Sequence, residues 1–230
     1  VLFRSGEKVA IIFEADNGEV TKVTYKEMLS KVSKFANALR GMGIKKGDRV
    51  AVGMRNYPEF AMAFWAIQSI GAVMVSLNAW WIGEELKYAL SDSGAVAAIV
   101  DGERFERLTK EMRDELGIKH VVVARSESSE GATSWSEATS NTNAVVPVVD
   151  IQPEDDATIL YTSGTTGFPK GAAGSHRNYI TNIWNGLFGA ALTMKVNGVT
   201  PPPADAPRPQ VTAFSTFPYF HIAGLCGMLS

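Results

Sequence analysis

The stretch that decides the fold of this chain is Tyr161-Thr162-Ser163-Gly164-Thr165-Thr166-Gly167-Phe168-Pro169-Lys170-Gly171. It combines five hydroxyl side chains with three glycines and one lysine. Glycine lets backbone N–H groups approach phosphate oxygens, hydroxyls add hydrogen-bond donors, and lysine supplies positive charge. An apolar run at 157–160 is typical of a buried strand, and a helical pattern begins near Ser175. We therefore predict a polyphosphate-binding loop between a strand and a helix.

Two ordinary interpretations of this loop are disfavoured. Gly164 and Lys170 have the Walker A spacing, but Pro169 replaces the glycine before the lysine. Gly171 also stands where a metal-binding Ser or Thr is needed, which argues against a P-loop NTPase. The other alternative is a Gly/Thr surface turn, which isolated glycine-rich stretches usually form. The length of the run and its Lys170 endpoint argue against that alternative.

Residues 161–171 resemble the phosphate-loop signature of the adenylate-forming superfamily. That superfamily includes acyl-CoA synthetases, coumarate-type CoA ligases, luciferases and peptide-synthetase adenylation domains. Segments 23–29, 71–78 and 217–224 resemble further elements of the family in the same order. The resemblance extends from about residue 6 to the end of the chain. It implies an α/β fold with mostly parallel sheets flanked by helices, in the form of an incomplete N-terminal domain.

Hydrophobic periodicity supports this fold class independently. Thr24 and Glu27 form a capping-box pattern, and the helix they open is expected to stop at Gly41. We expect strands at 9–13, 49–54, 72–77, 96–100, 119–124 and 211–217, and further helices at 58–70, 84–91 and 103–116. Strands that alternate with helices favour a largely parallel sheet covered on both faces.

The composition of the chain suggests where its parts begin and end. Residues 6–124 are predicted to form a first α/β subdomain, 125–154 a linker, and 155–230 the start of a second α/β subdomain with the phosphate loop. Residues 1–5, VLFRS, match the translated tail of a sequencing adapter, so we hypothesise that they are not biological. Because Ser230 falls inside an apolar helical pattern without a stop signal, we expect a fragment.

Charge and cysteine content narrow the possible partners and compartment. The 22 basic and 24 acidic residues give a net charge of −2, which argues against nonspecific nucleic-acid binding. The single cysteine, Cys226, fits a reducing, cytoplasmic location and is expected to be an inert core thiol. The uncharged stretch 60–77 is interrupted at Gln68 and Gly71, so we expect no transmembrane segment. Peripheral membrane contact stays open.

The resemblance implies an ATP-dependent acid–thiol ligase that works in two steps. A carboxylate attacks the α-phosphate of ATP and gives an acyl-adenylate and pyrophosphate. A thiol, usually that of coenzyme A, then displaces AMP and gives a thioester. Because the first step brings two anions together, catalysis depends on positioning and charge neutralisation.

The same resemblance implies roles for the residues of the phosphate loop. Contacts with the β- and γ-phosphates are expected from Thr162, Ser163, Gly164, Thr165, Thr166, Gly167 and Lys170. Phe168, Pro169 and Gly171 complete the nucleotide-binding loop, and Pro169 restricts Phe168 to extended geometry. Thr162 is also implied as a ligand of Mg²⁺, a hard cation that prefers oxygen. Lys170 is a candidate catalytic residue.

His221 is the second candidate catalytic residue. It lies in a segment that resembles the P-x-x-H-x-x-G element of the family, which implies that it orients the acid at the acyl pocket. A lone histidine in an apolar run is more often a core residue, so that alternative stays open. His176 and His120 are expected to be structural, and the three histidines are too dispersed for a metal site.

The sequence indicates the acid substrate and the acceptor of the acyl group less clearly than it indicates the reaction class. The sequence around Trp80 and Trp81 resembles bacterial fatty acyl-CoA ligases, which favours a medium- or long-chain fatty acid over an aryl acid such as a cinnamate. Alternatives are an enzyme that loads a carrier protein or uses oxygen, and a short nucleotide-binding paralogue without catalytic activity. We expect the 230-residue chain alone to be inactive, because the family's ribose-binding aspartate, metal-binding glutamate and C-terminal lysine are missing from it.

Overall fold

The computed structural model describes residues 5–126, 131–140, 143–162, 168–200, 203 and 210–229. Its strands are β1 (Val9–Glu14), β2 (Val20–Thr24), β3 (Arg49–Gly53), β4 (Val73–Ser76), β5 (Ala97–Asp101), β6 (His120–Ala124), β7 (Thr133–Ser134), β8 (Asp156–Thr162) and β9 (Lys170–Ser175). Its helices are α1 (Tyr25–Gly41), α2 (Pro58–Ser69), α3 (Gly83–Ser93), α4 (Gly102–Arg107), α5 (Lys110–Leu116), α6 (Trp135–Ala138), α7 (His176–Val196) and α8 (Ile222–Leu229).

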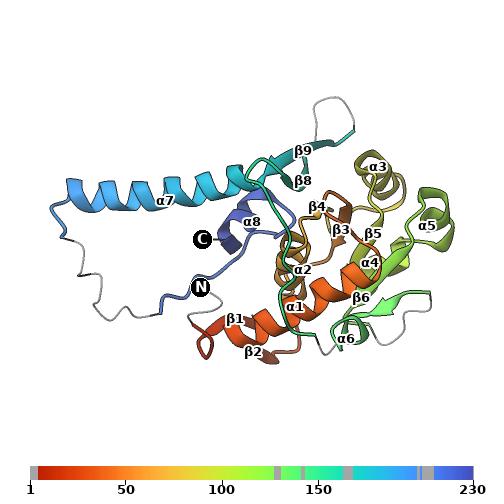
Figure 1. Ribbon diagram of the computed structural model, residues 1–230, viewed down its shortest axis with the longest axis horizontal. Coiled ribbons are helices and arrows are strands. Elements are labelled where there is room, and N and C mark those ends of the chain that lie inside the picture. Colours follow the sequence, from red (N-terminus) through yellow and green to blue (C-terminus); the bar gives the residue numbers. More distant parts are fainter. Residues whose placement is uncertain are drawn as a thin grey trace.

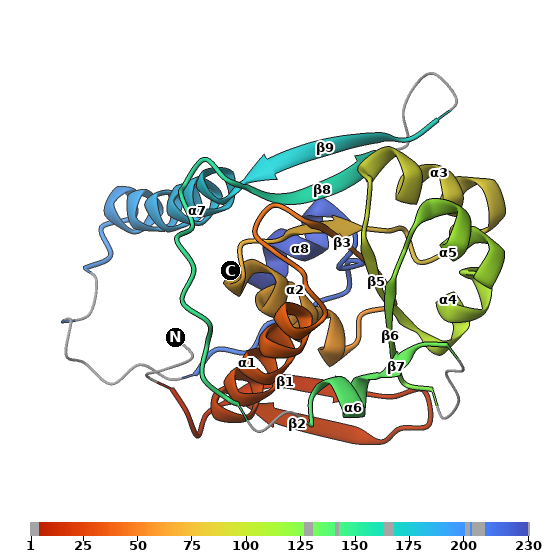
Figure 2. The same ribbon diagram turned by 45° about the vertical axis from the view of Figure 1, so that its right-hand side comes forward.

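A central sheet organises these elements (Figure 1). Its strand order is β7-β6-β5-β3-β4-β8-β9, and each neighbouring pair is parallel except β8 and β9 at one edge. Helices α1 and α2 lie on one side of the sheet and α3, α4 and α5 on the other (Figure 2). The predicted α/β class, with a mostly parallel sheet between helices, is confirmed.

The strand residues alternate between two hydrophobic cores, as the period of two in a strand requires. Val50 and Val52 pack with helices α1 and α2, whereas Ala51 packs with α3 on the opposite face. Because both faces are covered, the central strands consist mostly of apolar residues. The sheet is thus a layer between two groups of helices, with β7 and β9 as its edge strands.

Local signals in the sequence set the start of helix α1 as expected. The side chain of Thr24 accepts a hydrogen bond from the backbone N–H of Glu27 at 3.2 Å. The Glu27 carboxylate accepts in return from the backbone N–H of Thr24 at 2.8 Å, which completes the capping box. The face beyond this cap buries Met28, Val32, Phe35, Ala36 and Leu39.

Two predicted elements differ from the structure. The helix expected at 103–116 is divided into α4 and α5, because Thr109 caps a new helix by accepting from the backbone N–H of Met112. Leu108 at the break is buried, so the chain turns inward there. The strand expected at 211–217 is not formed, and Val211 and Phe214 are 86% and 93% exposed. A strand needs a neighbour to pair with, which an apolar pattern alone does not supply.

The prediction that the loop lies between a strand and a helix also needs correction. The chain leaves the loop in β9, which pairs with β8 before helix α7 begins. Strand β8 pairs with β4, with Ser76 opposite Leu160, so the predicted second α/β unit shares one sheet with the first. The subdomain boundary at residue 155 stays a proposal.

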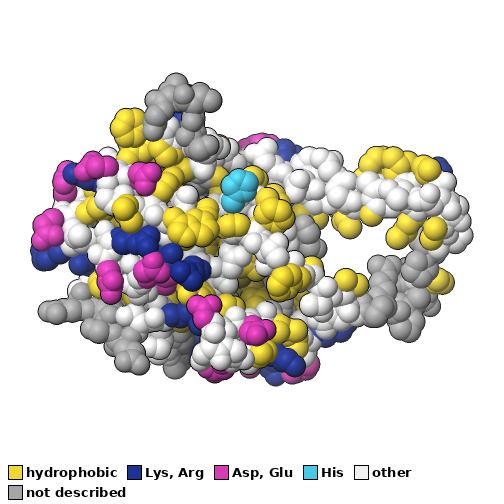
Figure 3. Space-filling view, turned by 180° about the vertical axis from the view of Figure 1, so that it is seen from behind, with side chains coloured by type: hydrophobic (Ala, Val, Ile, Leu, Met, Phe, Trp, Pro, Cys, Tyr) yellow, Lys and Arg dark blue, Asp and Glu magenta, His cyan; other side chains and the backbone are white. Residues whose placement is uncertain are grey.

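Helix α7 projects from the body of the molecule (Figure 1). None of its residues is buried, and Figure 3 shows hydrophobic side chains along it. Its large exposed apolar residues are Ile180, Trp184, Leu187, Phe188, Leu192, Met194 and Val196. In the part of the chain that the structure describes, no helix has the length and apolar character needed to cross a membrane.

Candidate functional site

The phosphate loop connects β8 and β9, and its two ends lie together. Thr162 pairs with Lys170 across the β8–β9 ladder, and the Thr162 hydroxyl donates to the Lys170 carbonyl oxygen at 3.4 Å. Both residues are exposed. Five of the predicted phosphate-contacting residues lie outside the described part of the chain: Ser163, Gly164, Thr165, Thr166 and Gly167. The described ends therefore locate the loop without giving its ligand contacts.

The exposed groups at these ends have the chemistry that the prediction requires. No acidic side chain among the described residues forms an ion pair with Lys170, so its charge is available to an anion. The hydroxyl of Thr162 uses its proton toward Lys170 and keeps lone pairs with which to meet a cation. Within the described ranges, no group of three or more His, Cys, Asp or Glu is placed to hold a metal ion. The role of Thr162 as a ligand of Mg²⁺ therefore stays a prediction.

The second candidate segment, residues 217–221, is fastened across the carboxyl end of the sheet. The Asn56 amide donates to the Phe217 carbonyl oxygen at 2.8 Å and accepts from the Tyr219 backbone N–H at 2.7 Å. The Ser76 hydroxyl donates to the Phe220 carbonyl oxygen at 3.1 Å. Asn56 follows β3 and Ser76 ends β4, so neighbouring strands hold this segment.

His221 stands at the start of helix α8. Its carbonyl oxygen accepts from the Leu225 backbone N–H at 2.9 Å, and its Nδ1 accepts from the Ala223 backbone N–H at 3.3 Å. An accepting Nδ1 favours the tautomer with the ring proton on Nε2. The side chain is exposed, so His221 is not a core residue here, and its substrate-orienting role stays a prediction.

Two consecutive tryptophans connect the two candidate segments. The Trp80 ring meets Phe220 edge-on at 5.3 Å, next to His221 in the chain. The Trp81 ring meets Tyr161 edge-on at 5.7 Å, at the start of the phosphate loop. Such edge-to-face pairs are favourable arrangements of aromatic rings. The structure therefore brings the start of the phosphate loop and the His221 segment to the same side of the sheet, where the parallel strands have their carboxyl ends.

Sequence reasoning missed several residues that hold this site. Asn56, Ser76 and Asp92 have ordinary polar side chains, and their partners lie 69 to 163 positions away in the chain. Their positions in the sequence could have indicated them, because Asn56 follows a strand and Ser76 ends one. Ligands of α/β sheets bind at the carboxyl ends of the strands. Position alone does not identify a bonding partner.

The remaining histidine and cysteine predictions concern residues away from the loop ends. Burial lowers the pKa of His176 below its usual value, against an opposing effect of Asp155, whose carbonyl oxygen accepts from the His176 backbone N–H at 3.1 Å. His176 is thus neutral near pH 7 at the start of α7, in keeping with a structural role. Burial raises the pKa of the Cys226 thiol, in keeping with an inert group.

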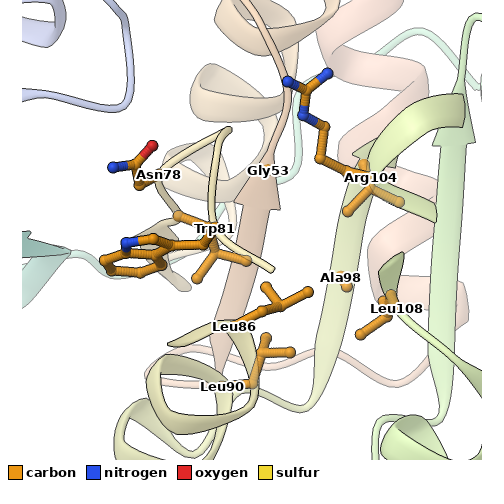
Figure 4. Close-up of a pocket in the computed structure, with 10 residues that line it drawn as sticks. Gly53, Asn78, Trp81, Leu86, Leu90, Ala98, Arg104 and Leu108 are labelled. Carbon is orange, nitrogen blue, oxygen red and sulfur yellow. The ribbon is translucent and has the colours of Figure 1, made fainter. Parts of the chain in front are cut away.

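A small cavity lies at the carboxyl ends of β3 to β5, but it is too small for an acyl chain. Its volume of about 10 Å³ offers room for a water molecule at most. Leu86, Leu90 and Leu108 line one side of it, and the Arg104 guanidinium points away from these leucines (Figure 4). The guanidinium instead bonds Asp101 at 3.1 Å and the Ala79 carbonyl oxygen at 2.7 Å.

Comparison with protein families gives the class to which this fold and loop belong. Residues 3–230 match the AMP-binding enzyme family, and the chain belongs to that family. The acetyl-coenzyme A synthetase of Cupriavidus metallidurans is 36% identical over 209 residues, covering 83% of this chain and 30% of the relative. The crotonobetaine/carnitine–CoA ligase of Salmonella typhimurium is 33% identical over 178 residues, covering 75% and 34%. The chain thus spans about a third of the length of these relatives.

Solved structures agree with this membership. The anthranilate CoA ligase AuaEII in complex with anthranoyl-AMP superposes with a TM-score of 0.71 at 27% identity, covering 77% of this chain and 34% of that one. A long-chain-fatty-acid-CoA ligase, FadD1 from Archaeoglobus fulgidus, gives a TM-score of 0.73 at 24% identity, covering 98% and 42%. The second likeness concerns the fold alone.

Proposed function

We propose that this chain is the N-terminal part of an AMP-forming acyl-CoA synthetase. A carboxylic acid reacts with ATP to give an acyl-adenylate and pyrophosphate, and the coenzyme A thiol then displaces AMP to give the acyl-CoA. Family membership and the CoA ligases among its relatives support the reaction class. The observation that supports the proposal is the pairing of Thr162 with Lys170, which puts a hydroxyl group and an ammonium group without an acidic partner among the described residues at the ends of the signature loop.

Each described residue has a defined task in the adenylation step. The Lys170 ammonium group offsets negative charge on the phosphates as the carboxylate approaches, which is an electrostatic contribution to catalysis. The Thr162 hydroxyl oxygen meets Mg²⁺, which supplies further charge neutralisation when bound. Outside the described residues, Ser163, Thr165 and Thr166 are proposed from the sequence to supply hydroxyl donors.

The rest of the loop and His221 complete the proposed site. Gly164, Gly167 and Gly171 allow close approach of the backbone to the phosphates. Phe168 and Pro169 shape the exit of the loop. His221, on the Trp80 side of the same edge, orients the acid without serving as the nucleophile.

The acid that we propose as the substrate is an aliphatic carboxylate. The sequence around Trp80 and Trp81 favours a medium- or long-chain fatty acid. Relatives named for acetate and for crotonobetaine or carnitine extend the range to short aliphatic acids. The anthranilate ligase keeps aryl acids as the alternative class.

The experiment that tests this function is product identification with the complete ligase. It is incubated with ATP, Mg²⁺ and coenzyme A plus acetate, octanoate, palmitate, carnitine, anthranilate or cinnamate, one at a time. Mass spectrometry should find AMP, pyrophosphate and one acyl-CoA in equal amounts for at least one acid. A reaction without coenzyme A should stop at the acyl-adenylate. Formation of ADP, or no acid-dependent product with the whole panel, contradicts the proposal.

A further inference from the structure

Helix α3 contacts both ends of the phosphate loop with two side chains that lie one turn apart. The Tyr161 hydroxyl, at the entry of the loop, donates to the Asp92 carboxylate at 2.7 Å. The Phe168 ring, at the exit, lies 4.9 Å from the Tyr88 ring with an angle of 31° between the planes. Residues four apart on a helix share a face. One helix face thus holds residues on either side of the loop.

The helix that makes these contacts is itself firmly held. Ala89 and Leu90 are 0% and 1% exposed in the core shared with β3, β4 and β5. Gly94 ends the helix in the left-handed conformation, with φ of 62°. A buried face with a defined end leaves α3 little freedom to move, because protein interiors are close-packed. Tyr88 and Asp92 therefore project from a fixed base.

The entry contact keeps its character across the physiological pH range. Burial, followed by the Asp92 hydrogen bond, raises the pKa of Tyr161 well above its usual value. The phenol therefore keeps the proton that it donates to Asp92. Tyr161 also lies 3.1 Å from the Ala89 carbonyl oxygen and packs against Trp81. Three contacts converge on the residue just before Thr162.

The exit contact is made by a residue whose backbone is already restricted. Pro169 follows Phe168 and limits it to extended geometry. Although Phe168 is 61% exposed, its ring packs against the Tyr88 ring in a tilted arrangement. The direction in which the chain enters β9 at Lys170 is therefore set by this contact.

We propose that Tyr88 and Asp92 are positioning residues for the adenylation step. They hold the entry and exit of the phosphate loop so that Thr162 and Lys170 present their side chains to the nucleotide phosphates from a fixed place. They act through Tyr161 and Phe168 and do not touch the nucleotide. This inference rests on the proposed function.

The first test measures the loop without nucleotide, by the rate at which trypsin cleaves after Lys170. Tyr88→Ala and Asp92→Ala should each raise that rate about 5- to 10-fold, since cleavage follows the population of opened chain. Tyr88→Phe keeps the stacked ring and should cleave like the unaltered chain. Ser91→Ala, an exposed change on the same helix, is the matched control and should also leave the rate unchanged. If neither Tyr88→Ala nor Asp92→Ala changes the rate of cleavage after Lys170, the proposal is overturned.

The second test measures acid-dependent ATP–pyrophosphate exchange in the complete ligase as a function of ATP concentration. Tyr88→Ala and Asp92→Ala should lower kcat/KM for ATP by about 10- to 100-fold, because small misplacements of catalytic groups are costly. KM for the acid should stay unchanged, a separation that general loss of structure does not produce. Tyr88→Phe, which keeps the aromatic ring, should have the same kcat/KM for ATP as the unaltered ligase.

The outcomes of the second test separate the inference from the function on which it rests. Faster cleavage with unaltered ATP kinetics overturns the positioning role. If the unaltered ligase shows no exchange with any acid, the proposed function fails. In that case the cleavage rates alone decide whether Tyr88 and Asp92 hold the loop.

Discussion

Asn56 holds the backbone of Tyr219 through a 2.7 Å hydrogen bond, although 163 positions separate the two residues in the chain. The same side chain donates to Phe217, so one amide uses both its donor and its acceptor on one segment. Peptide backbone outside regular structure needs such partners. This pair therefore explains why residues 217–221 lie against the carboxyl end of β3 without forming a strand.

Asn56→Ala should loosen this segment. Two hydrogen bonds are lost, so the free energy of unfolding should fall by about 1–2 kcal/mol in a denaturant titration. Hydrogen exchange of the amides at 217–221 should become faster. Asn185→Ala, at an exposed position on α7, is the control and should change neither quantity. Exchange at 217–221 that stays at the unaltered rate would show that Asn56 does not hold the segment.

Thr24→Ala should destabilise helix α1, because it removes the side chain that caps the first turn. The expected loss in the free energy of unfolding is about 1 kcal/mol. Combining it with Glu27→Ala should cost less than the sum of the single changes, since the two side chains bond each other's backbone. Strict additivity in this double-mutant cycle would contradict a reciprocal capping box.

The ion pair between Lys46 and Asp155 predicts a pH dependence. Lys46 lies 2.6 Å from the Asp155 carboxylate, and this hydrogen bond, with one from the Gln152 backbone, lowers the pKa of Asp155. Folding therefore favours the charged carboxylate. Its contribution is present above the ordinary aspartate pKa of about 4 and is lost as the pH falls through the lowered value.

Asp155→Asn should accordingly destabilise the chain at pH 7, and this destabilisation should shrink as the pH falls from the ordinary aspartate pKa of about 4 through the lowered value. Free energies of unfolding for both forms at pH 7, 5 and 3.5 measure the difference. A difference that stays constant over this range would contradict the lowered pKa of Asp155.

The exposed apolar side chains of α7 should dominate the surface hydrophobicity of the chain. Trp184 and Phe188 are 66% and 71% exposed, one turn apart on the helix. Replacing both with serine should lower the fluorescence of a hydrophobic dye such as ANS and reduce self-association in sedimentation experiments. The thermal midpoint should change little, because neither side chain is buried. Equal dye binding before and after the change would show that the dye-binding surface lies elsewhere.

The sequence predicted the fold well where short-range signals decide it. The Thr24 capping box, Pro58 at the start of α2 and the apolar strands each depend on neighbouring residues, and each is present in the structure. The predictions that failed concern places where two local signals compete, or where a strand needs a partner from elsewhere in the chain. A cap at Thr109 outweighed continuous helical periodicity, and the apolar pattern at 211–217 had no strand to pair with among the described residues.

The candidate site was predictable as a motif but not as an arrangement. The loop at 161–171 could be located because glycines, hydroxyls and a lysine are concentrated there. Its attachment to α3 through Asp92 and Tyr88 joins residues 69 or more positions apart. Side-chain pairs at that separation depend on how the sheet assembles, which local patterns do not encode.

The most direct test of the proposed function is acid-dependent ATP–pyrophosphate exchange by Lys170→Ala in the complete ligase, beside Lys195→Ala as control. Both lysines are exposed, and only Lys170 lies at the phosphate loop. Lys170→Ala should reduce exchange by about 100-fold with an unchanged thermal midpoint, because it removes charge that stabilises the transition state. Lys195→Ala should exchange like the unaltered ligase. Full exchange activity in Lys170→Ala would contradict the assignment of this loop as the site that activates ATP.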